Sequence, residues 1–197
     1  MADSVTDRQA WLQARSVGLA ATSDEPVPID FRKVFRETFD YVWHSLRRLG
    51  VRERDLEDVA HEVFLVVHRT LDAYDRSRPL RPWLFAFAVR AAADYRRLAR
   101  HRIELRDDTS SLVDEGPTPH DRADAREQLD LVARALDTLD FDRRTIFVLH
   151  QIDGVPVNQA AAALGIPVNT AHSRLRLARA DFARAVHRLQ SARRGAR

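Results

Sequence analysis

The chain has 197 residues, a formal net charge of +3, a sequence pI near 9.9 and no cysteine. The lack of cysteine excludes disulfides, thiolate nucleophiles and cysteine-ligated zinc, and no stretch approaches the roughly 20 apolar residues that span a bilayer. Lys33 is the only lysine, so the other 31 basic side chains are arginines, which bind phosphate and guanine through paired hydrogen bonds. The first residues, MADSVTDRQAWLQARS, lack the basic start and apolar core of a signal peptide, and we expect a cytoplasmic protein without membrane insertion.

An amphipathic helix is predicted after a weakly patterned N-terminal extension, residues 1–29. Apolar side chains recur at three- and four-residue spacing from Phe31 to Leu49, and Gly50 is suited to end the helix. A second helix is expected from a cap at or near Asp55 to about Leu71.

The third helix is expected to begin at Pro82, because proline lacks the backbone N–H that the first turn of a helix leaves unpaired. It follows a loop, residues 72–81, and runs to about residue 102. Three helices with short connections predict one small all-α domain, residues 30–102.

Charge is sorted between the second and third of these helices. Residues 52–62 carry five acids against two arginines, whereas residues 81–102 carry six arginines against Asp94 alone. Four aromatic side chains are interleaved with these arginines: Trp83, Phe85, Phe87 and Tyr95. Unpaired bases stack on aromatic rings while arginines hold the backbone, so the third helix is a candidate for binding opened strands. Ordinary solvated charge is the alternative, and some of the rings must belong to the core.

An acidic linker, residues 103–124, is expected to join this domain to a second one, residues 125–190, which a basic tail follows at 191–197. The linker contains Gly116, Pro117 and Pro119 among many acids, which favours an exposed, irregular segment. The second domain opens with a helix whose apolar positions are Leu129, Val132, Ala133, Leu136 and Leu139. Another helix is expected over residues 141–152, with Asp142 as its cap.

Residues 154–179, GVPVNQAAAALGIPVNTAHSRLRLAR, form a predicted helix-turn-helix. Gly165 can adopt the left-handed conformation that ends a helix, and Pro167 fits at the start of the next one. Small alanines let the helix at 157–164 lie close to the second helix, with apolar contacts from Leu164, Ile166, Val168, Ala171 and Leu175. Polar and basic side chains then face outward, where such motifs contact bases and phosphates: Asn169, Thr170, His172, Ser173, Arg174 and Arg176.

Arginine dominates the charge of the last predicted helix and the residues after it. Residues 167–197 carry eight arginines against Asp181 alone, a pattern typical of contact with a phosphate backbone. An ordinary helical hairpin with a solvated basic face is the alternative.

Catalytic and metal sites are not predicted. His61 and Glu62 could begin a metalloprotease motif, but that motif needs a second histidine four residues after the first, where this chain has Leu65. Neither a glycine-rich phosphate loop nor a G-x-S-x-G segment occurs. We therefore expect no enzyme activity, no cofactor and no bound metal.

Two blocks of the sequence resemble one family, the extracytoplasmic-function (ECF) sigma factors of the sigma-70 family. DLEDVAHEVFLVVHR and RPWLFAFAVRAAADYRR, within residues 55–97, resemble their second conserved region. ALDTLDFDRRTIFVLHQIDGVPVNQAAAALGIPVNTAHSRLRLAR, residues 135–179, resembles their fourth. Together the blocks cover most of residues 31–188. The resemblance implies two small helical domains on a flexible linker and a role in transcription initiation.

The resemblance also implies a role for each surface. Binding of the acidic helix to the coiled coil of the RNA polymerase β′ subunit falls on Asp55, Asp58, Glu62, Phe64 and Leu65. Recognition and opening of the promoter minus-ten element falls on Tyr74, Arg81, Trp83, Arg90, Asp94, Tyr95, Arg96 and Arg97. Recognition of the minus-thirty-five duplex falls on the six outward residues of the helix-turn-helix, with Arg143 and Arg144 on phosphate. The implied partners are core RNA polymerase, through its β′ and β subunits, promoter DNA and an anti-sigma factor.

Two other hypotheses remain open at this point. A stand-alone helix-turn-helix repressor or activator would bind duplex DNA without polymerase and would need a symmetric site. A purely structural interaction protein is the third hypothesis, which the arginine-rich recognition helix disfavours. The chain also departs from the family pattern at His172, where the family often has lysine or arginine.

Overall fold

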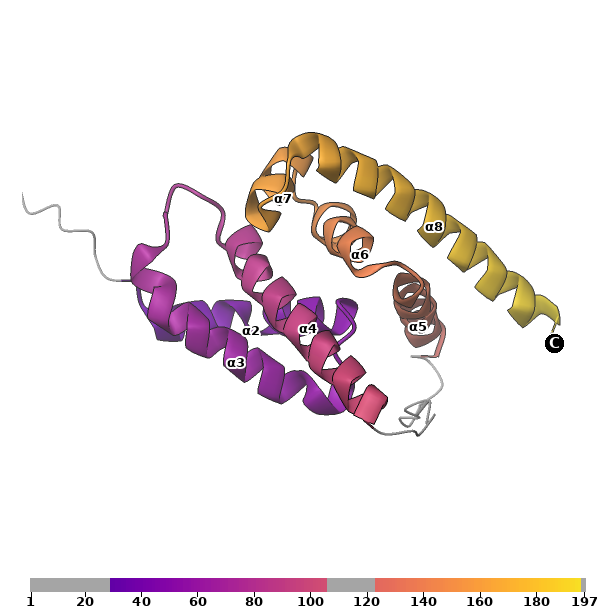
Figure 1. The fold of residues 1–197 in the computed structure, drawn as a ribbon, viewed down its shortest axis with the longest axis horizontal. Coiled ribbons are helices and arrows are strands. Elements are labelled where there is room, and N and C mark those ends of the chain that lie inside the picture. The colour runs from indigo at the N-terminus through magenta and orange to yellow at the C-terminus, as the bar shows by residue number, and fades with distance from the viewer. Residues whose placement is uncertain (1–28, 106–122, 196–197) are drawn as a thin grey trace, which may run out of the picture.

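The computed structural model describes residues 29–105 and 123–195, and every regular element in those two ranges is a helix (Figure 1). The expected N-terminal extension, most of the expected linker and the last residues of the expected tail lie outside the described residues. The all-α prediction is confirmed. Helices α2–α4 form one group, called here the N-terminal bundle, and α5–α8 form the C-terminal bundle.

The N-terminal bundle consists of α2 (Phe31–Arg48), α3 (Leu56–Thr70) and α4 (Leu80–Leu105), which pack against one another. Asp30 caps α2 by accepting a hydrogen bond from the backbone N–H of Arg32 at 2.9 Å. Gly50 follows α2 in the left-handed region, with φ of 93°. Short 3₁₀ turns, Glu53–Asp55 and Leu71–Ala73, flank α3.

The predicted starts of two helices differ from the observed ones. Helix α4 begins at Leu80, so Pro82 lies within its first turn rather than opening it. Asp55 stands at the cap position of α3, but its side chain makes no capping hydrogen bond. That carboxylate instead accepts a hydrogen bond from the Tyr95 hydroxyl of α4, so it joins two helices.

The C-terminal bundle consists of α5 (Ala123–Asp137), α6 (Phe141–Phe147), the π-helical turn η4 (Val148–Ile152), α7 (Val157–Leu164) and α8 (Val168–Gly195). The predicted cap of α6 is wrong: Asp140 accepts from the Arg143 backbone N–H at 2.9 Å, whereas Asp142 forms an ion pair with Arg174. The predicted apolar face of α5 is buried only at its end. Leu136 and Leu139 are buried, but Leu129 is 68% exposed.

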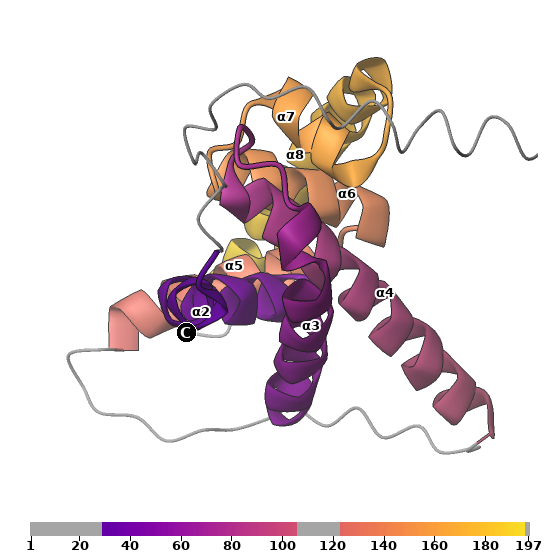
Figure 2. The ribbon, with the colours of Figure 1, turned by 90° about the vertical axis from the view of Figure 1, so that its left-hand side faces the viewer.

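The two bundles pack directly against each other. In Figure 1 α4 lies between α3 and the C-terminal helices, and α4 contacts α7. Figure 2 shows α6, α7 and α8 gathered at one end of the N-terminal bundle. A single hydrophobic core runs through both bundles, from Leu46 and Phe85 on one side to Val155 and Ala160 on the other. The contact between the bundles therefore includes buried apolar surface as well as polar groups.

Candidate nucleic-acid interface

Helices α7 and α8 form the helix-turn-helix that the sequence predicts. Gly165 ends α7 with φ of 64° and ψ of 32°, the left-handed conformation expected there. The backbone N–H of Ile166 then donates to the carbonyl of Ala161 at 3.0 Å, which closes the turn. Ala160 and Ala161 are fully buried, and so is Ala171 of α8, because these small side chains let the two helices approach closely. Val168, an expected contact between the helices, is instead 44% exposed.

The first turns of α8 present the side chains that the sequence assigns to the minus-thirty-five duplex. Exposed side chains there are Asn169, His172, Ser173 and Arg176, and the half-buried ones are Thr170 and Arg174. Arg174 pairs with Asp142, and the Ser173 hydroxyl donates to the Thr170 carbonyl at 2.9 Å. The N-terminal part of a recognition helix is where such motifs reach base edges.

Arg143 and Arg144, the predicted phosphate contacts, have very different surroundings. Arg143 is half-buried and pairs with Asp140 and Asp181. Arg144 is only 2% exposed and pairs with Asp137 at 3.0 Å. Burial lowers the pKa of the Arg144 guanidinium, an effect that Asp137 opposes. Arg144 cannot reach DNA in this arrangement, so its predicted contact would require the two bundles to separate.

A row of aromatic rings runs from the loop before α4 onto that helix. The ring centroids of Tyr74 and Trp83 are 4.8 Å apart, as are those of Trp83 and Phe87. The guanidinium of Arg90 lies over the Phe87 ring at 5.6 Å. The first pair is tilted and the second is edge-to-face, so the rings are not stacked on one another. Aromatic rings beside a cation are the kind of surface on which unpaired bases stack while the cation contacts the adjoining phosphate. Phe85, in contrast, is fully buried and belongs to the core.

The other predicted minus-ten residues on α4 are partly occupied by contacts within the chain. Arg97 pairs with Asp94 at 3.0 Å, and both side chains are exposed. The Tyr95 hydroxyl donates to Asp55, and burial followed by this carboxylate raises the pKa of Tyr95, which keeps the hydroxyl protonated. Arg96 lies over the ring of Phe141 in the C-terminal bundle, at 5.1 Å.

Helix α3 carries the predicted polymerase-binding side chains on two different faces. Asp58 and Glu62 are exposed, and Leu65 beside them is 46% exposed. Phe64 is buried instead, with its ring 4.7 Å from that of Phe35 on α2. The exposed acids and Leu65 form a mixed acidic and apolar surface, while Phe64 supports it from beneath. Phe35 is itself partly exposed, a feature that the regular apolar spacing of α2 did not distinguish from burial.

Two features are absent from the described residues. None of the helices there is long and apolar enough to cross a membrane. Within residues 29–105 and 123–195, no group of three or more histidine, cysteine or carboxylate side chains could hold a metal ion.

The fold and its surfaces define the class of protein. It is a helical DNA-binding protein with a helix-turn-helix and a separate aromatic and basic helix.

Family models and curated relatives agree on one family. The model described as Sigma-70 region 2 matches residues 34–102, and the one described as Sigma-70, region 4 matches residues 129–182. RNA polymerase sigma factor CnrH of Cupriavidus metallidurans is 32% identical over 149 residues, which cover 70% of this chain and 76% of the relative. The ECF RNA polymerase sigma factor SigE of Mycolicibacterium smegmatis is 31% identical, over 79% of this chain and 61% of the relative.

Solved structures with the same fold include two sigma-factor complexes. CnrH in complex with the cytosolic domain of CnrY superposes with a TM-score of 0.58 at 28% identity, over 80% of this chain and 87% of that one. The sigma factor RpoE in complex with the anti-sigma factor NepR, from Bartonella quintana, gives 0.62 at 20% identity, over 80% and 97%. At the lower identity the likeness concerns the fold alone.

The chain belongs to the sigma-70 family, as an RNA polymerase sigma factor of the ECF group. It therefore binds core RNA polymerase and directs promoter-specific transcription initiation. The predicted family membership and function are confirmed, whereas the roles predicted for individual residues stay predictions.

Proposed function

We propose that three surfaces of this sigma factor divide the work of initiation. The exposed acids of α3 with Leu65 bind the β′ coiled coil of core polymerase, and the β subunit is a second contact. The aromatic row and the arginines of α4 capture the minus-ten element as its strands separate. The first turns of α8 read the minus-thirty-five duplex. The functional domains on this proposal are residues 30–102 and 125–190.

The observation that carries the proposal is the aromatic row from Tyr74 through Trp83 to Phe87, which ends at the Arg90 guanidinium. Trp83 and Phe87 pack against the core but are only half-buried, so part of each ring is open to a base. Bases in a duplex are already stacked on one another and do not need such rings. Bases that leave the duplex gain roughly 1–3 kcal/mol each from stacking on an aromatic side chain. The row therefore favours strand capture over simple duplex binding.

Three further properties concern catalysis, location and control. We infer that it has no catalytic activity of its own and works in the cytoplasm. We also infer that an anti-sigma factor controls it, because one solved relative is a complex with an anti-sigma factor and another is a complex with the cytosolic domain of CnrY. The exposed apolar side chains Leu129 and Val132 on α5 offer surface for a protein partner.

Charge reversal at Asp58 tests the polymerase surface. Asp58→Arg should weaken binding to core polymerase by about tenfold or more. If the acids of α3 face basic groups of the polymerase, the new arginine meets charges of its own sign, which costs several kcal/mol at an interface. Duplex binding should stay close to that of the control. The control is Asp40→Arg, the same change at an exposed position of α2 that is not assigned to any surface. Equal losses of polymerase binding in both variants would show that net charge, rather than this surface, governs the interaction.

Truncation of Arg176 tests the duplex surface. Arg176 is exposed on α8, and if it neutralises one phosphate its removal should reduce the slope of log affinity against log salt by about 0.9. The measurement is a titration of a fluorescent duplex at several salt concentrations. Arg188→Ala, which lies more than three turns further along the same helix, is the matched control. An unchanged salt slope for Arg176→Ala would remove this residue from the proposed duplex contact.

A further inference from the structure

One carboxylate of the C-terminal bundle collects polar groups from the N-terminal bundle. Asp153 lies between η4 and α7, and its side chain is only 7% exposed. Its Oδ2 accepts a hydrogen bond from the Tyr41 hydroxyl at 2.9 Å, and its Oδ1 lies 3.3 Å from Nη1 of Arg48. Arg81 lies over the Tyr41 ring at 5.5 Å and adds a second positive charge near the same carboxylate.

The Tyr41 hydroxyl is a permanent donor in this contact. Burial, followed by the neighbouring Asp153 carboxylate, raises the pKa of Tyr41 far above its usual range. The hydroxyl therefore stays protonated at any physiological pH. Tyr41, Arg48 and Asp153 belong to none of the three proposed functional surfaces, so their role in joining the bundles needs its own explanation.

A second contact joins the bundles at Gly50. A Cβ atom added there would lie 2.7 Å from Nη1 of Arg144, so the loop after α2 closes tightly over this buried arginine. Within the part of the chain that the structure describes, the buried Nε of Arg144 has no hydrogen-bond partner, and Arg96 of α4 brings a like charge close to it. Arg144 is thus enclosed by the opposite bundle, while its ion-pair partner Asp137 belongs to its own bundle.

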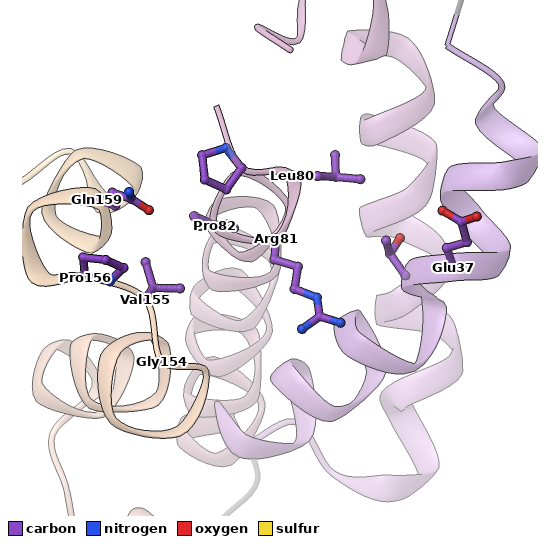
Figure 3. Close-up of a pocket in the computed structure, with 10 residues that line it drawn as sticks. Glu37, Leu80, Arg81, Pro82, Gly154, Val155, Pro156 and Gln159 are labelled. Atoms are coloured by element: carbon purple, nitrogen blue, oxygen red, sulfur yellow. The ribbon is translucent and has the colours of Figure 1, made fainter. Parts of the chain in front are cut away.

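A cleft of about 510 Å³ is lined by Gly154, which follows Asp153 in the chain, and by Arg81 (Figure 3). Its walls come from α2, from the start of α4, and from the residues that lead into α7. Pro82 faces Val155 and Pro156 across it, whereas the Arg81 side chain extends toward α2. The segment proposed to capture the minus-ten element therefore lies opposite the first helix of the helix-turn-helix. In motifs of this kind that first helix crosses the DNA backbone.

We propose that the Asp153 contact is an autoinhibitory latch, which holds the free chain closed by joining its own two bundles. While it is closed, Arg144 is buried, Arg96 lies over Phe141 and α7 lies on α4, so groups proposed to bind promoter DNA cover one another. Opening of the latch frees Arg96 and Arg144 together, whereas the exposed side chains at the start of α8 are accessible in the closed form as well. The closure itself follows from the contacts between the bundles, whereas its effect on DNA binding rests on the proposed function.

The charges at this interface explain why the latch can open. Four arginines gather between the bundles, Arg48, Arg81, Arg96 and Arg144, against the carboxylates Asp153 and Asp137. Asp137 is mostly exposed, so water already screens much of its pairing with Arg144. Phosphates of promoter DNA would supply the missing negative charge. DNA and closure therefore compete for the same cations, and a ligand that binds only the open form shifts the equilibrium toward it.

Energy transfer between two dyes measures the closure directly. The chain has no cysteine, so cysteines introduced at the exposed positions His44 on α2 and Ala183 on α8 label one site in each bundle. The free wild-type protein should give mainly one high-transfer population. Asp153→Arg places a third positive charge beside Arg48 and Arg81. Arg48→Glu places a new carboxylate next to that of Asp153, so the two repel each other across the interface. Each variant should raise the low-transfer population about tenfold or more, because a tenfold change in the equilibrium corresponds to the loss of one charge-assisted hydrogen bond.

Binding of a short mixed-sequence duplex then tests the masking, because apparent affinity rises with the fraction of open molecules. Arg48→Glu is the sharper variant, since it removes positive charge and should nevertheless bind the duplex more tightly. Arg36→Glu and Asp130→Arg are the charge-matched controls, both at exposed positions. Asp153→Arg should exceed its control in the same way.

Three results would overturn the inference. A wild-type chain that is already open, or transfer unchanged in both latch variants, would remove the closure. If Arg48→Glu opens the chain but does not bind the duplex more tightly, closure does not mask DNA binding. This conclusion holds when Arg176→Ala weakens duplex binding in the same assay. If Arg176→Ala has no effect there either, the proposed duplex surface fails instead, and the closure is judged by energy transfer alone.

Discussion

Substitution of Gly165 by alanine isolates the backbone cost of the turn in the helix-turn-helix. Gly165 has φ of 64°, and a Cβ atom added there would meet nothing within 4 Å. The change therefore adds no steric clash and removes no contact. Only the intrinsic penalty of the left-handed conformation remains, which is about 1–2 kcal/mol for a residue with a Cβ atom.

The net loss should be somewhat smaller than that penalty. Alanine also restricts the unfolded chain, which offsets roughly 0.4–1 kcal/mol. We expect a net loss of about 1 kcal/mol in the free energy of unfolding, or a fall in Tm of about 2–4 °C for a chain of this size. Gly165→Asn should cost less, because asparagine tolerates this conformation better.

Two other glycines provide the matched comparison in equilibrium urea unfolding. Gly154 has φ of 72° and equally open surroundings, so Gly154→Ala should cost about as much as Gly165→Ala. Gly50→Ala should cost clearly more, because its Cβ would also press on Arg144. Equal losses at all three positions would refute the account of Gly50, and no loss at Gly165 would refute the left-handed turn.

Three further predictions concern the cap, the core and the buried carboxylate. Asp140→Ala should lower the unfolding free energy by about 1 kcal/mol, because it removes the cap of α6. Asp142→Ala removes only an exposed ion pair and should change that energy by less than about half as much. A larger loss for Asp142→Ala than for Asp140→Ala would show that Asp142 is the cap. Leu46→Ala should cost about 2–5 kcal/mol in the same assay, because Leu46 is fully buried, and a loss below about 1 kcal/mol would contradict its place in the core. Burial raises the pKa of the Asp153 carboxyl, although the Tyr41 hydrogen bond and the Arg48 charge act in the opposite direction. As pH falls, Asp153 therefore becomes protonated in the folded state before it does in the unfolded state. The unfolding free energy of the wild type, relative to that of Asp153→Asn, should therefore rise as pH falls toward the usual carboxyl pKa. A fall of this difference over the same range would show that folding lowers the pKa of Asp153.

Local signals predicted the helix-turn-helix closely. The alanine-rich run at residues 157–164 became α7 with the same limits, because a strong helix former is followed at once by Gly165, which suits a left-handed end. The cap of α6 was missed by two residues, because Asp140 and Asp142 are equally good capping residues and sequence alone does not fix where the first turn begins.

Burial was harder to predict than helix type. The apolar spacing of α5 placed Leu129 and Leu136 on one face, but only Leu136 reaches the core, since its neighbours there come from helices distant in sequence. The contact between Tyr41 and Asp153 spans 112 positions and leaves no periodic signal in either segment. Arg144 looked like an exposed phosphate contact for the same reason, because its burial depends on Gly50 of the other bundle.

Sigma-factor activity is measured by transcription in vitro with core RNA polymerase, on genomic fragments and with this protein as the only added factor. We expect new transcripts whose start sites share paired upstream elements, and we expect these transcripts to be lost with Asp58→Arg but not with Asp40→Arg. Tight binding of a symmetric duplex without polymerase, together with no new transcript, would contradict this expectation.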